Sequence, residues 1–238
     1  MALPKLNVPV YEAILPSTEK VIKYRPFLVK EEKLLLTAQE SGEDAVLPAV
    51  KQIIKNCVQG EIDVDSMPIF DIEYLFLRLR AKSIGEEVTL GLKPWGCPQN
   101  NGELCKFTTE VTINLEEIEC KKGKNHSSKI MLDDNVGIMM KYPDISQIGI
   151  KGSEIEMGMK VIKSCIKMIF TEEETHERDS FTDKELDEFI DSLNSKQMEG
   201  INNFFETMPT IKHTAKYTCK TCDEEKETTI QGLQSFFG

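Results

Sequence analysis

Four cysteines occur as two pairs, and this pattern constrains the fold more than any other feature of the sequence. Cys219 and Cys222 form a C-x2-C motif, and Cys97 and Cys105 enclose seven residues in the segment WGCPQNNGELCKF. The chain has 7 cysteines in all. An odd number favours metal ligands or free thiols over a set of disulfides.

Each pair lies at the tip of a predicted β-hairpin, because alternating apolar residues flank it on both sides. Two hairpin tips that meet around a metal form a zinc ribbon, and zinc prefers four ligands in a tetrahedron. We therefore predict a structural zinc (Zn) site formed by Cys97, Cys105, Cys219 and Cys222. Protein would fill all four positions, so no open position would remain for a catalytic water.

Other interpretations of the cysteines stay open. A spacer of seven residues is longer than the usual two to four in zinc sites, which makes the first pair weak on its own. His213 could replace one of those cysteines, although its alternation with Ile211 and Ala215 is typical of an ordinary strand residue. The thiols could also be redox-active or metal-free. A thioredoxin-like site would need a βαβ unit, whereas this C-x2-C lies between antiparallel strands.

The hydropathy pattern predicts an α+β fold with an N-terminal β-hairpin and helices, a zinc-ribbon-like pair of β-hairpins, and a helical insertion. The helices are expected at about 30–39, 44–59, 68–82, 155–170, 182–193 and 195–206. The helix at 182 has the clearest start, a capping box from Thr182 to Glu185. The predicted domains are an N-terminal hairpin plus three-helix region (1–85), a zinc-ribbon-like β module (86–115 and 209–238) and a mixed strand/helical insertion (116–208).

Charge and hydropathy exclude several classes of partner. The net charge is −11, and non-specific binding to duplex DNA depends on Lys and Arg side chains that displace counterions. Nucleic acid is therefore an improbable partner on composition. No stretch approaches about 18 consecutive apolar residues, so we expect no membrane span. The first residues, MALPKLNVPVYEAILP, contain no apolar block of signal-peptide length, so we expect no secretion.

The sequence offers no catalytic motif. The phosphate-binding motifs, the nucleophile elbow and the H-E-x-x-H zinc motif are all absent. The 3 histidines are interpreted as surface or strand residues, and the paired carboxylates lie in polar runs that are typical of a solvated face. We therefore expect the protein not to be an enzyme.

Three stretches, spread from end to end of the chain, carry a family resemblance. They are LPSTEKVIKYRPFLVKEEKLLLTA (15–38), FDIEYLFLRLRAKSIGEEVTL (70–90) and YTCKTCDEEKETTIQGLQSFFG (217–238). These stretches resemble the small baseplate hub subunit of T-even-type (T4-like) contractile-tailed bacteriophages and of their marine and cyanobacterial relatives. The segment 116–208 lies outside them, and the family role carries over to it least.

The resemblance implies a virion protein that is made in the cytoplasm of the infected host and joins the central hub of the tail baseplate. The partners that it implies are other baseplate hub proteins and the tape-measure protein, with the spike complex as a further candidate. Two alternatives stay open. One is a tail-assembly chaperone that is absent from the virion. The other is a zinc-ribbon regulator that binds nucleic acid or RNA polymerase through Lys121, Lys122, Lys124, Lys129 and Trp95.

Two apolar segments are candidates for binding a partner. Phe236 and Phe237 either anchor in a partner or fold back on the chain's own core. Tyr24 and Phe27, in Tyr24-Arg-Pro-Phe27, form the second candidate, with packing in the core as the other interpretation.

Overall fold

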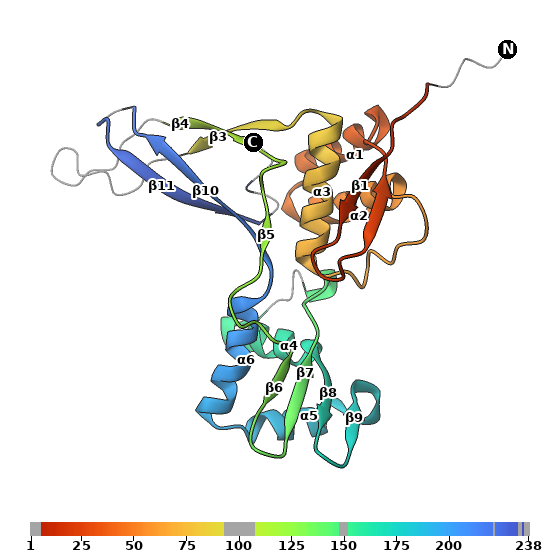
Figure 1. The fold of residues 1–238 in the computed structure, drawn as a ribbon, viewed down its shortest axis with the longest axis vertical. Helices are drawn as coiled ribbons and strands as arrows, with labels where there is room; N and C mark the ends of the chain where they lie inside the picture. Colours follow the sequence, from red (N-terminus) through yellow and green to blue (C-terminus); the bar gives the residue numbers. More distant parts are fainter. Residues whose placement is uncertain (1–5, 93–107, 148–151, 221, 233–234, 236–238) are drawn as a thin grey trace. The chain divides into compact units, whose positions relative to one another are not determined.

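The computed structural model describes residues 6–92, 108–147, 152–220, 222–232 and 235. These residues divide into two compact units (Figure 1). The first unit comprises Met1–Val64, Phe70–Lys121 and Thr210–Gly238, and the second comprises Asp65–Ile69 and Lys122–Pro209. Helices are combined with small antiparallel sheets, which confirms the predicted α+β class. None of the described helices has the length and apolar character needed to cross a membrane.

The first unit begins with a β-hairpin. Its strands are β1 (Tyr11–Ile14) and β2 (Val21–Tyr24), which pair antiparallel. Ala13 and Tyr24 are buried, whereas Ile14 and Val21, which face each other across the hairpin, are exposed. The alternation of buried and exposed residues fixes which face of the hairpin meets the helices.

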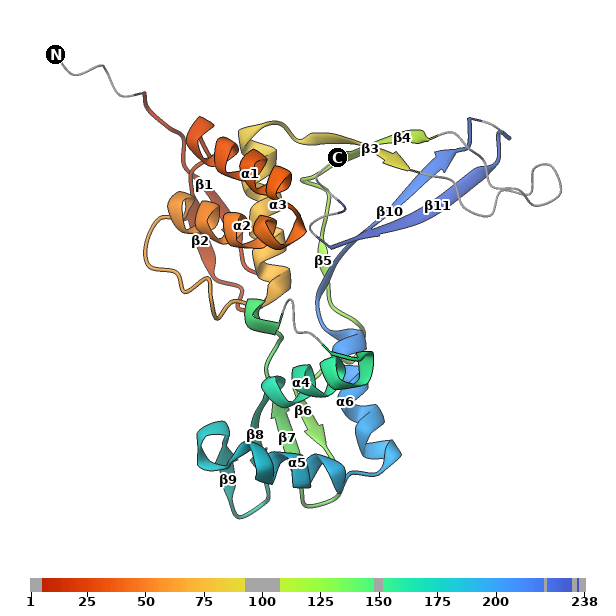
Figure 2. The ribbon, with the colours of Figure 1, turned by 180° about the vertical axis from the view of Figure 1, so that it is seen from behind.

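Three helices follow the hairpin: α1 (Val29–Ser41), α2 (Glu43–Cys57) and α3 (Ile69–Ser83). Helices α1 and α2 are separated by Gly42, whose φ of 109° lies in the region that favours glycine. Helices α1 and α2 lie behind the hairpin in Figure 1 and in front of it in Figure 2. Helix α3 lies in the core and has buried residues on most of its sides: Phe70, Asp71, Ile72, Leu75, Phe76, Leu77, Leu79 and Ala81.

The C-terminal end of α3 packs on two small sheets. One is the hairpin of β3 (Glu87–Leu92) and β4 (Thr109–Asn114), and the other has the order β11-β10-β5. The strands of the second sheet are β5 (Cys120–Lys121), β10 (Thr210–Thr218) and β11 (Glu225–Gln231). Together with α3 they enclose a core of Leu77, Ala81, Val88, Leu90, Ile113, Leu115, Ile118, Ile211, Ala215 and Ile230.

The second unit is built around a four-stranded antiparallel sheet with the order β6-β7-β8-β9. Its strands are β6 (Lys129–Met131), β7 (Gly137–Met140), β8 (Ile166–Phe170) and β9 (Thr175–Glu177). Its helices are α4 (Glu154–Cys165), α5 (Asp183–Asp191) and α6 (Ser195–Thr207), with short 3₁₀ turns η1 (Ile145–Gln147) and η2 (Arg178–Ser180). The core includes Ile138, Cys165, Ile166, Ile201 and Phe204.

Side-chain caps start the helices of the second unit. The predicted capping box of α5 is confirmed, because the Thr182 hydroxyl accepts from the Glu185 amide and the Glu185 carboxylate accepts from the Thr182 amide. Equivalent boxes start α4 at Ser153 and α6 at Asn194. Each side chain binds a backbone donor that the helix leaves without a partner.

One predicted boundary is wrong. The apolar pattern predicts a single helix over 155–170, whereas α4 ends at Cys165 and β8 starts at Ile166. The segment Ile-Lys-Met-Ile-Phe is rich in strand-forming residues, and β7 supplies the hydrogen-bonding partners. Pairing with a strand that is distant in sequence overrides the helical periodicity here.

Candidate functional site

The C-x2-C motif lies in the turn between β10 and β11, as the sequence predicts. The Cys219 amide donates to the Glu224 carbonyl at 2.9 Å, and the Asp223 amide donates to the Cys219 carbonyl at 2.8 Å. Asp223 has a φ of 55°, a left-handed conformation that Asp adopts more readily than most residues. These bonds fold the turn so that Cys222 packs against Cys219.

The turn places two thiols of the predicted zinc site side by side. Cys219 is buried and Cys222 is half-buried, and two thiolates from one turn can fill two of the four tetrahedral positions of zinc. His213 lies six residues before Cys219 on the extended strand β10, which separates them by about 20 Å at about 3.4 Å per residue. Strand geometry therefore excludes His213 as a ligand to the same metal.

The other predicted ligands, Cys97 and Cys105, lie outside the described residues. The strands that flank them end at the pair Leu92↔Thr109, so residues 93–108 join β3 to β4 at that end of the hairpin. Hairpins β3–β4 and β10–β11 belong to the same unit, share one core and extend toward the same side in both ribbon views (Figures 1 and 2).

A complete metal site is not present among the described residues. No group of three or more His, Cys, Asp or Glu side chains in this part of the chain is arranged to hold a metal ion. The zinc site of Cys97, Cys105, Cys219 and Cys222, and with it the zinc-ribbon pairing, therefore stays a prediction. What the structure contributes is the turn that holds the second pair.

The three remaining cysteines are poor candidates for chemistry. Burial raises the pKa of Cys57 and of Cys165 to about 11, and it raises that of Cys120, in β5, to about 12. A thiol reacts and binds metal as the thiolate, which is scarce at neutral pH when the pKa is this high. Cys57 and Cys165 are buried at the C-terminal ends of α2 and α4.

The N-terminal partner-binding candidates lie inside the first unit. Tyr24 is 2% exposed and Phe27 is 6% exposed. The Phe27 ring stacks on Phe76 with centroids 6.5 Å apart, and the Phe27 amide donates to the Ser83 hydroxyl at 2.9 Å. Packing in the core accounts for both residues in this chain, and their contact with a partner stays a prediction. Phe236 and Phe237 lie outside the described residues.

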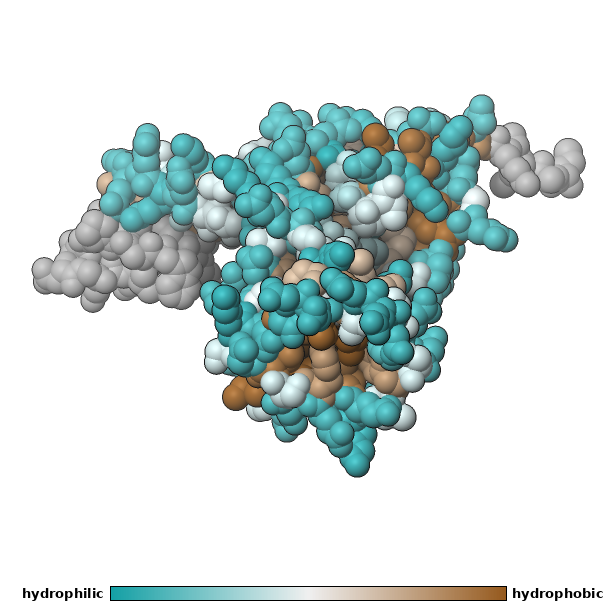
Figure 3. All heavy atoms as spheres, turned by 60° about the horizontal axis from the view of Figure 1, so that its bottom comes forward, coloured by the Kyte–Doolittle hydropathy of each residue, from teal (hydrophilic) through white to brown (hydrophobic). Residues whose placement is uncertain are grey.

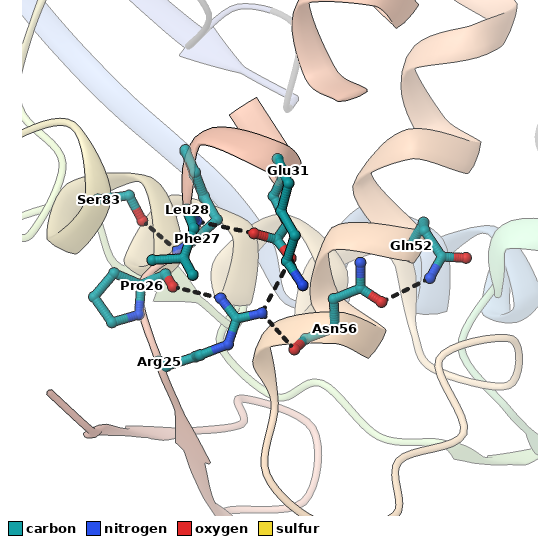
Figure 4. A network of polar contacts seen from close by, with 9 residues as sticks. Arg25, Pro26, Phe27, Leu28, Glu31, Gln52, Asn56 and Ser83 are labelled. Atoms are coloured by element: carbon teal, nitrogen blue, oxygen red, sulfur yellow. Dashed lines mark hydrogen bonds and ion pairs between the residues drawn. The ribbon is translucent and has the colours of Figure 1, made fainter. Parts of the chain in front are cut away.

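Sequence reasoning missed a buried ion pair between the hairpin and α1. Arg25 donates to the Glu31 carboxylate at 3.0 Å and also to the carbonyls of Pro26 at 2.9 Å and Asn56 at 3.0 Å (Figure 4). The second Glu31 oxygen accepts from the Leu28 amide at 2.9 Å. Glu31 stands three residues after the N-cap, a position typical of such a contact. Because the predicted helix starts at 30, Glu31 did not fall at the third helical position, and the capping contact was missed.

The surroundings of Glu31 favour its charged form. Its side chain is 1% exposed, and burial acts to raise the pKa of the carboxyl. The hydrogen bonds from Arg25 and from the Leu28 amide, together with the Arg25 charge, outweigh burial and leave the pKa below its usual value. The pair thus ties β2, α1 and the end of α2 together through a charged group.

Asp71 of α3 is a second buried carboxylate, 1% exposed, and it accepts hydrogen bonds from the amide and the hydroxyl of Ser17. Burial raises the pKa of Asp71, although the bonds from Ser17 oppose the rise. These bonds hold the tip of the N-terminal hairpin against α3. They join segments 54 residues apart, which no local motif indicates.

The second unit contains one histidine in an aromatic cluster. His126 contacts the Thr207 hydroxyl at 2.9 Å through Nδ1 and the Tyr142 hydroxyl at 3.0 Å through Nε2. Its ring centroid lies 5.1 Å from that of Phe204. Burial, with a smaller effect of Lys122, lowers the pKa of His126 and keeps the ring neutral at neutral pH. His126 lies in the loop between β5 and β6, and the contacts with Tyr142 and with α6 half-bury its ring.

The comparisons with known proteins give one finding for this chain. A family model described as T4 bacteriophage base plate protein matches residues 8–238, which includes both units. Neither the search of curated proteins nor the search of solved structures gave a match.

Proposed function

The chain belongs to the T4 bacteriophage base plate protein family, and on this premise we propose that it is a non-enzymatic, structural component of the central hub of the baseplate. The observation that carries the proposal is the family match over residues 8–238. The finer assignment to the hub is supported by the stretches at 15–38, 70–90 and 217–238, which resemble the small hub subunit. The buried carboxylates Glu31 and Asp71 hold the N-terminal hairpin to the helices, so they serve the fold, as expected in a structural protein.

The family places the protein in the virion tail baseplate, with other baseplate proteins as its partners. Within that setting we propose hub proteins and the tape-measure protein as direct neighbours, with the spike complex as a further candidate. Synthesis takes place in the cytoplasm of the infected host. The tail-assembly chaperone is the second candidate function, because an acidic chain of two compact units also suits a protein that leaves before the tail is complete.

Mass spectrometry of purified virions tests the assembly role. A hub component is retained in washed particles at a constant ratio to the other hub proteins, whereas a chaperone is depleted from them. A pull-down of the N-terminally tagged chain from infected cells, with untagged chain as control, then identifies the neighbours. Recovery of hub and tape-measure proteins supports the hub. Recovery of RNA polymerase or nucleic acid without tail proteins would instead favour the regulator.

We also propose that the hairpin tips bind one structural zinc ion through Cys97, Cys105, Cys219 and Cys222. Zinc would supply a cross-link between two hairpins that share one core. Elemental analysis of the purified full chain is expected to find one zinc per wild-type chain and none in Cys222→Ser, whose melting temperature falls. Cys120→Ser is the matched control, because this thiol lies in the same unit outside the turn. Full zinc content in Cys222→Ser would contradict the site.

A further inference from the structure

The sheet of the second unit has two faces, and the helices of the unit cover one of them. The helices α4 and α5 lie in front of β7 and β8 in Figure 2, and the sheet lies before α5 in Figure 1. The covered face carries Ile130, Ile138 and Ile169, which pack in the core with residues of all three helices. The other face meets none of these helices.

The middle of this second face is also apolar, and Lys129, Thr175 and Glu177 lie beside it on the same face. The register places Met139 beside Met168, and Gly137 beside both Met131 and Phe170. Met131 is 50% exposed, and the side chains of Met139, Met168 and Phe170 are half-buried. The Phe170 ring lies over Gly137, since a Cβ added there would run into the ring. We call these four side chains, Met131, Met139, Met168 and Phe170, the methionine face.

The composition of the strands points to a missing layer. Strands that are buried on both faces have nearly continuous apolar sequences, whereas strands with one wet face alternate. In β7 the sequence is Gly-Ile-Met-Met, and in β8 it is Ile-Lys-Met-Ile-Phe; β11, by contrast, alternates as Glu-Lys-Glu-Thr-Thr-Ile-Gln. A sheet with two apolar faces packs against two layers, and this unit supplies one. Methionine is flexible and polarisable, and it is common on surfaces that adapt to a partner.

The acidic residues at one end of the methionine face indicate that the partner is basic. The β6–β7 turn and the β8–β9 turn lie at the same end of the sheet, because β7 and β8 are antiparallel. Their exposed acidic residues are Asp133, Asp134, Glu172, Glu173 and Glu174, and Glu177 lies on β9. Lys129 is a cation that the register places on this face, beside Met139, and its Nζ lies 4.9 Å from the Phe170 ring centroid. Figure 3, which brings this end of the molecule forward, shows apolar atoms exposed among hydrophilic ones.

We infer that the methionine face binds an amphipathic, basic helix of another baseplate protein. Its apolar side would cover the methionines, and Lys or Arg side chains at one end would meet the acidic turns. Four strands about 4.8 Å apart span roughly 14 Å, enough for one helix of about 10 Å diameter. Only the source of the helix, a baseplate protein, rests on the proposed function. The binding assay below uses a synthetic peptide, so it tests the methionine face independently of that function.

A peptide-binding assay on the full-length chain tests the inference. The probe is a dye-labelled amphipathic peptide of about 18 leucine and lysine residues, about five helical turns, and the control peptide has glutamate in place of lysine. Fluorescence anisotropy is expected to give binding of the lysine peptide at a Kd on the order of 10 μM, weaker in high salt, and about tenfold weaker binding of the glutamate peptide.

Matched variants locate the binding. The double variant Met131→Ser, Met168→Ser is expected to weaken binding of the lysine peptide about tenfold. Ile155→Ser is the control, because Ile155 is an apolar residue 80% exposed on α4, in the helix layer, and its loss leaves binding unchanged. Glu172→Gln with Glu173→Gln alters exposed turn residues, and it is expected to weaken binding and reduce its salt dependence.

Three results would overturn the inference. The first is equal binding of the lysine and glutamate peptides. The second is wild-type binding by the Glu172→Gln, Glu173→Gln variant, which stays informative even if the methionine variant unfolds. The third is a wild-type dimer in sedimentation that the methionine substitutions dissolve, because the occupant would then be a second copy of this chain. None of these results bears on retention of the protein in virions, which tests the proposed function separately.

Discussion

The substitution Glu31→Gln is expected to destabilise the first unit strongly, because it removes the charge that Arg25 faces in a nearly dry setting. Glutamine keeps an oxygen that can accept from the Leu28 amide, so the change removes only the ion pairs of Glu31, which are the one with Arg25 and a second with exposed Lys30 at 3.3 Å. Removing one partner of a buried pair costs about 3–5 kcal/mol. Arg25 keeps 19% of its side chain exposed and still donates to two carbonyls, which lowers the expected loss to about 2–3 kcal/mol.

Equilibrium urea unfolding followed by circular dichroism measures this loss. A chain of two compact units can unfold in two steps, and Glu31→Gln should move only the step of the first unit. The pKa of Glu31 is lowered in the folded chain, so its contribution is complete above the ordinary value of 4.5 and is lost as the pH falls through the lowered one. The gap between wild type and variant should therefore narrow below pH 4.5.

A matched control is Glu40→Gln, which neutralises an exposed carboxylate on the same helix and should change stability by less than about 0.5 kcal/mol. Arg25→Leu combined with Glu31→Leu should lose less than the sum of the two single changes, because no buried charge is left without its partner. If Glu31→Gln behaves like Glu40→Gln, the ion pair contributes nothing and the reasoning fails.

Three further outcomes follow from the packing. Asp71→Asn should raise the free energy of unfolding at pH 7, because burial raises the pKa of Asp71 and penalises its charge; the gain should vanish below the ordinary value of 3.8, and urea unfolding at both pH values checks this. Because the pKa of His126 is lowered in the folded chain, its contribution to stability is complete above pH 6.5 and is lost as the pH falls through the lowered pKa. The melting temperature of the wild type should therefore drop over that pH range, and that of His126→Gln should change less. Thr182→Ala removes the α5 cap and should lower the free energy of unfolding of the second unit by about 1 kcal/mol. Urea unfolding checks this, and an unchanged midpoint for the second unit would contradict it.

The parts of the fold that local sequence determines were predictable. The capping box at Thr182 and the C-x2-C turn are formed by neighbouring residues, and both occur where the sequence predicts them. Helix α3 was predictable for a related reason, because a helix with apolar residues on most sides has no stable place other than a core.

The misses depend on contacts between distant segments. Strand β8 follows α4 without a break, and only pairing with β7 distinguishes it from a further helical turn. The bond of Arg25 with the Asn56 carbonyl crosses 31 residues, and the bonds of Asp71 with Ser17 cross 54. In the sequence these charged residues look like the many exposed ones. Their burial makes them important, and burial is a property of the folded chain.

The pairing of β5 with β10 has a consequence for how the gene could vary in length. The second unit leaves the sheet after Lys121 and returns at Thr210, and these two residues are antiparallel partners. Their Cα atoms therefore stand about 5 Å apart, a gap that a two-residue turn closes in an ordinary hairpin. The segment 122–209 thus leaves and rejoins this sheet at one pair of residues, so its length could change while the register of β10 with β5 and β11 stays intact. Asp65–Ile69, which belongs to the same unit, is bonded to it separately, because the Ile69 amide donates to the Pro143 carbonyl at 3.1 Å.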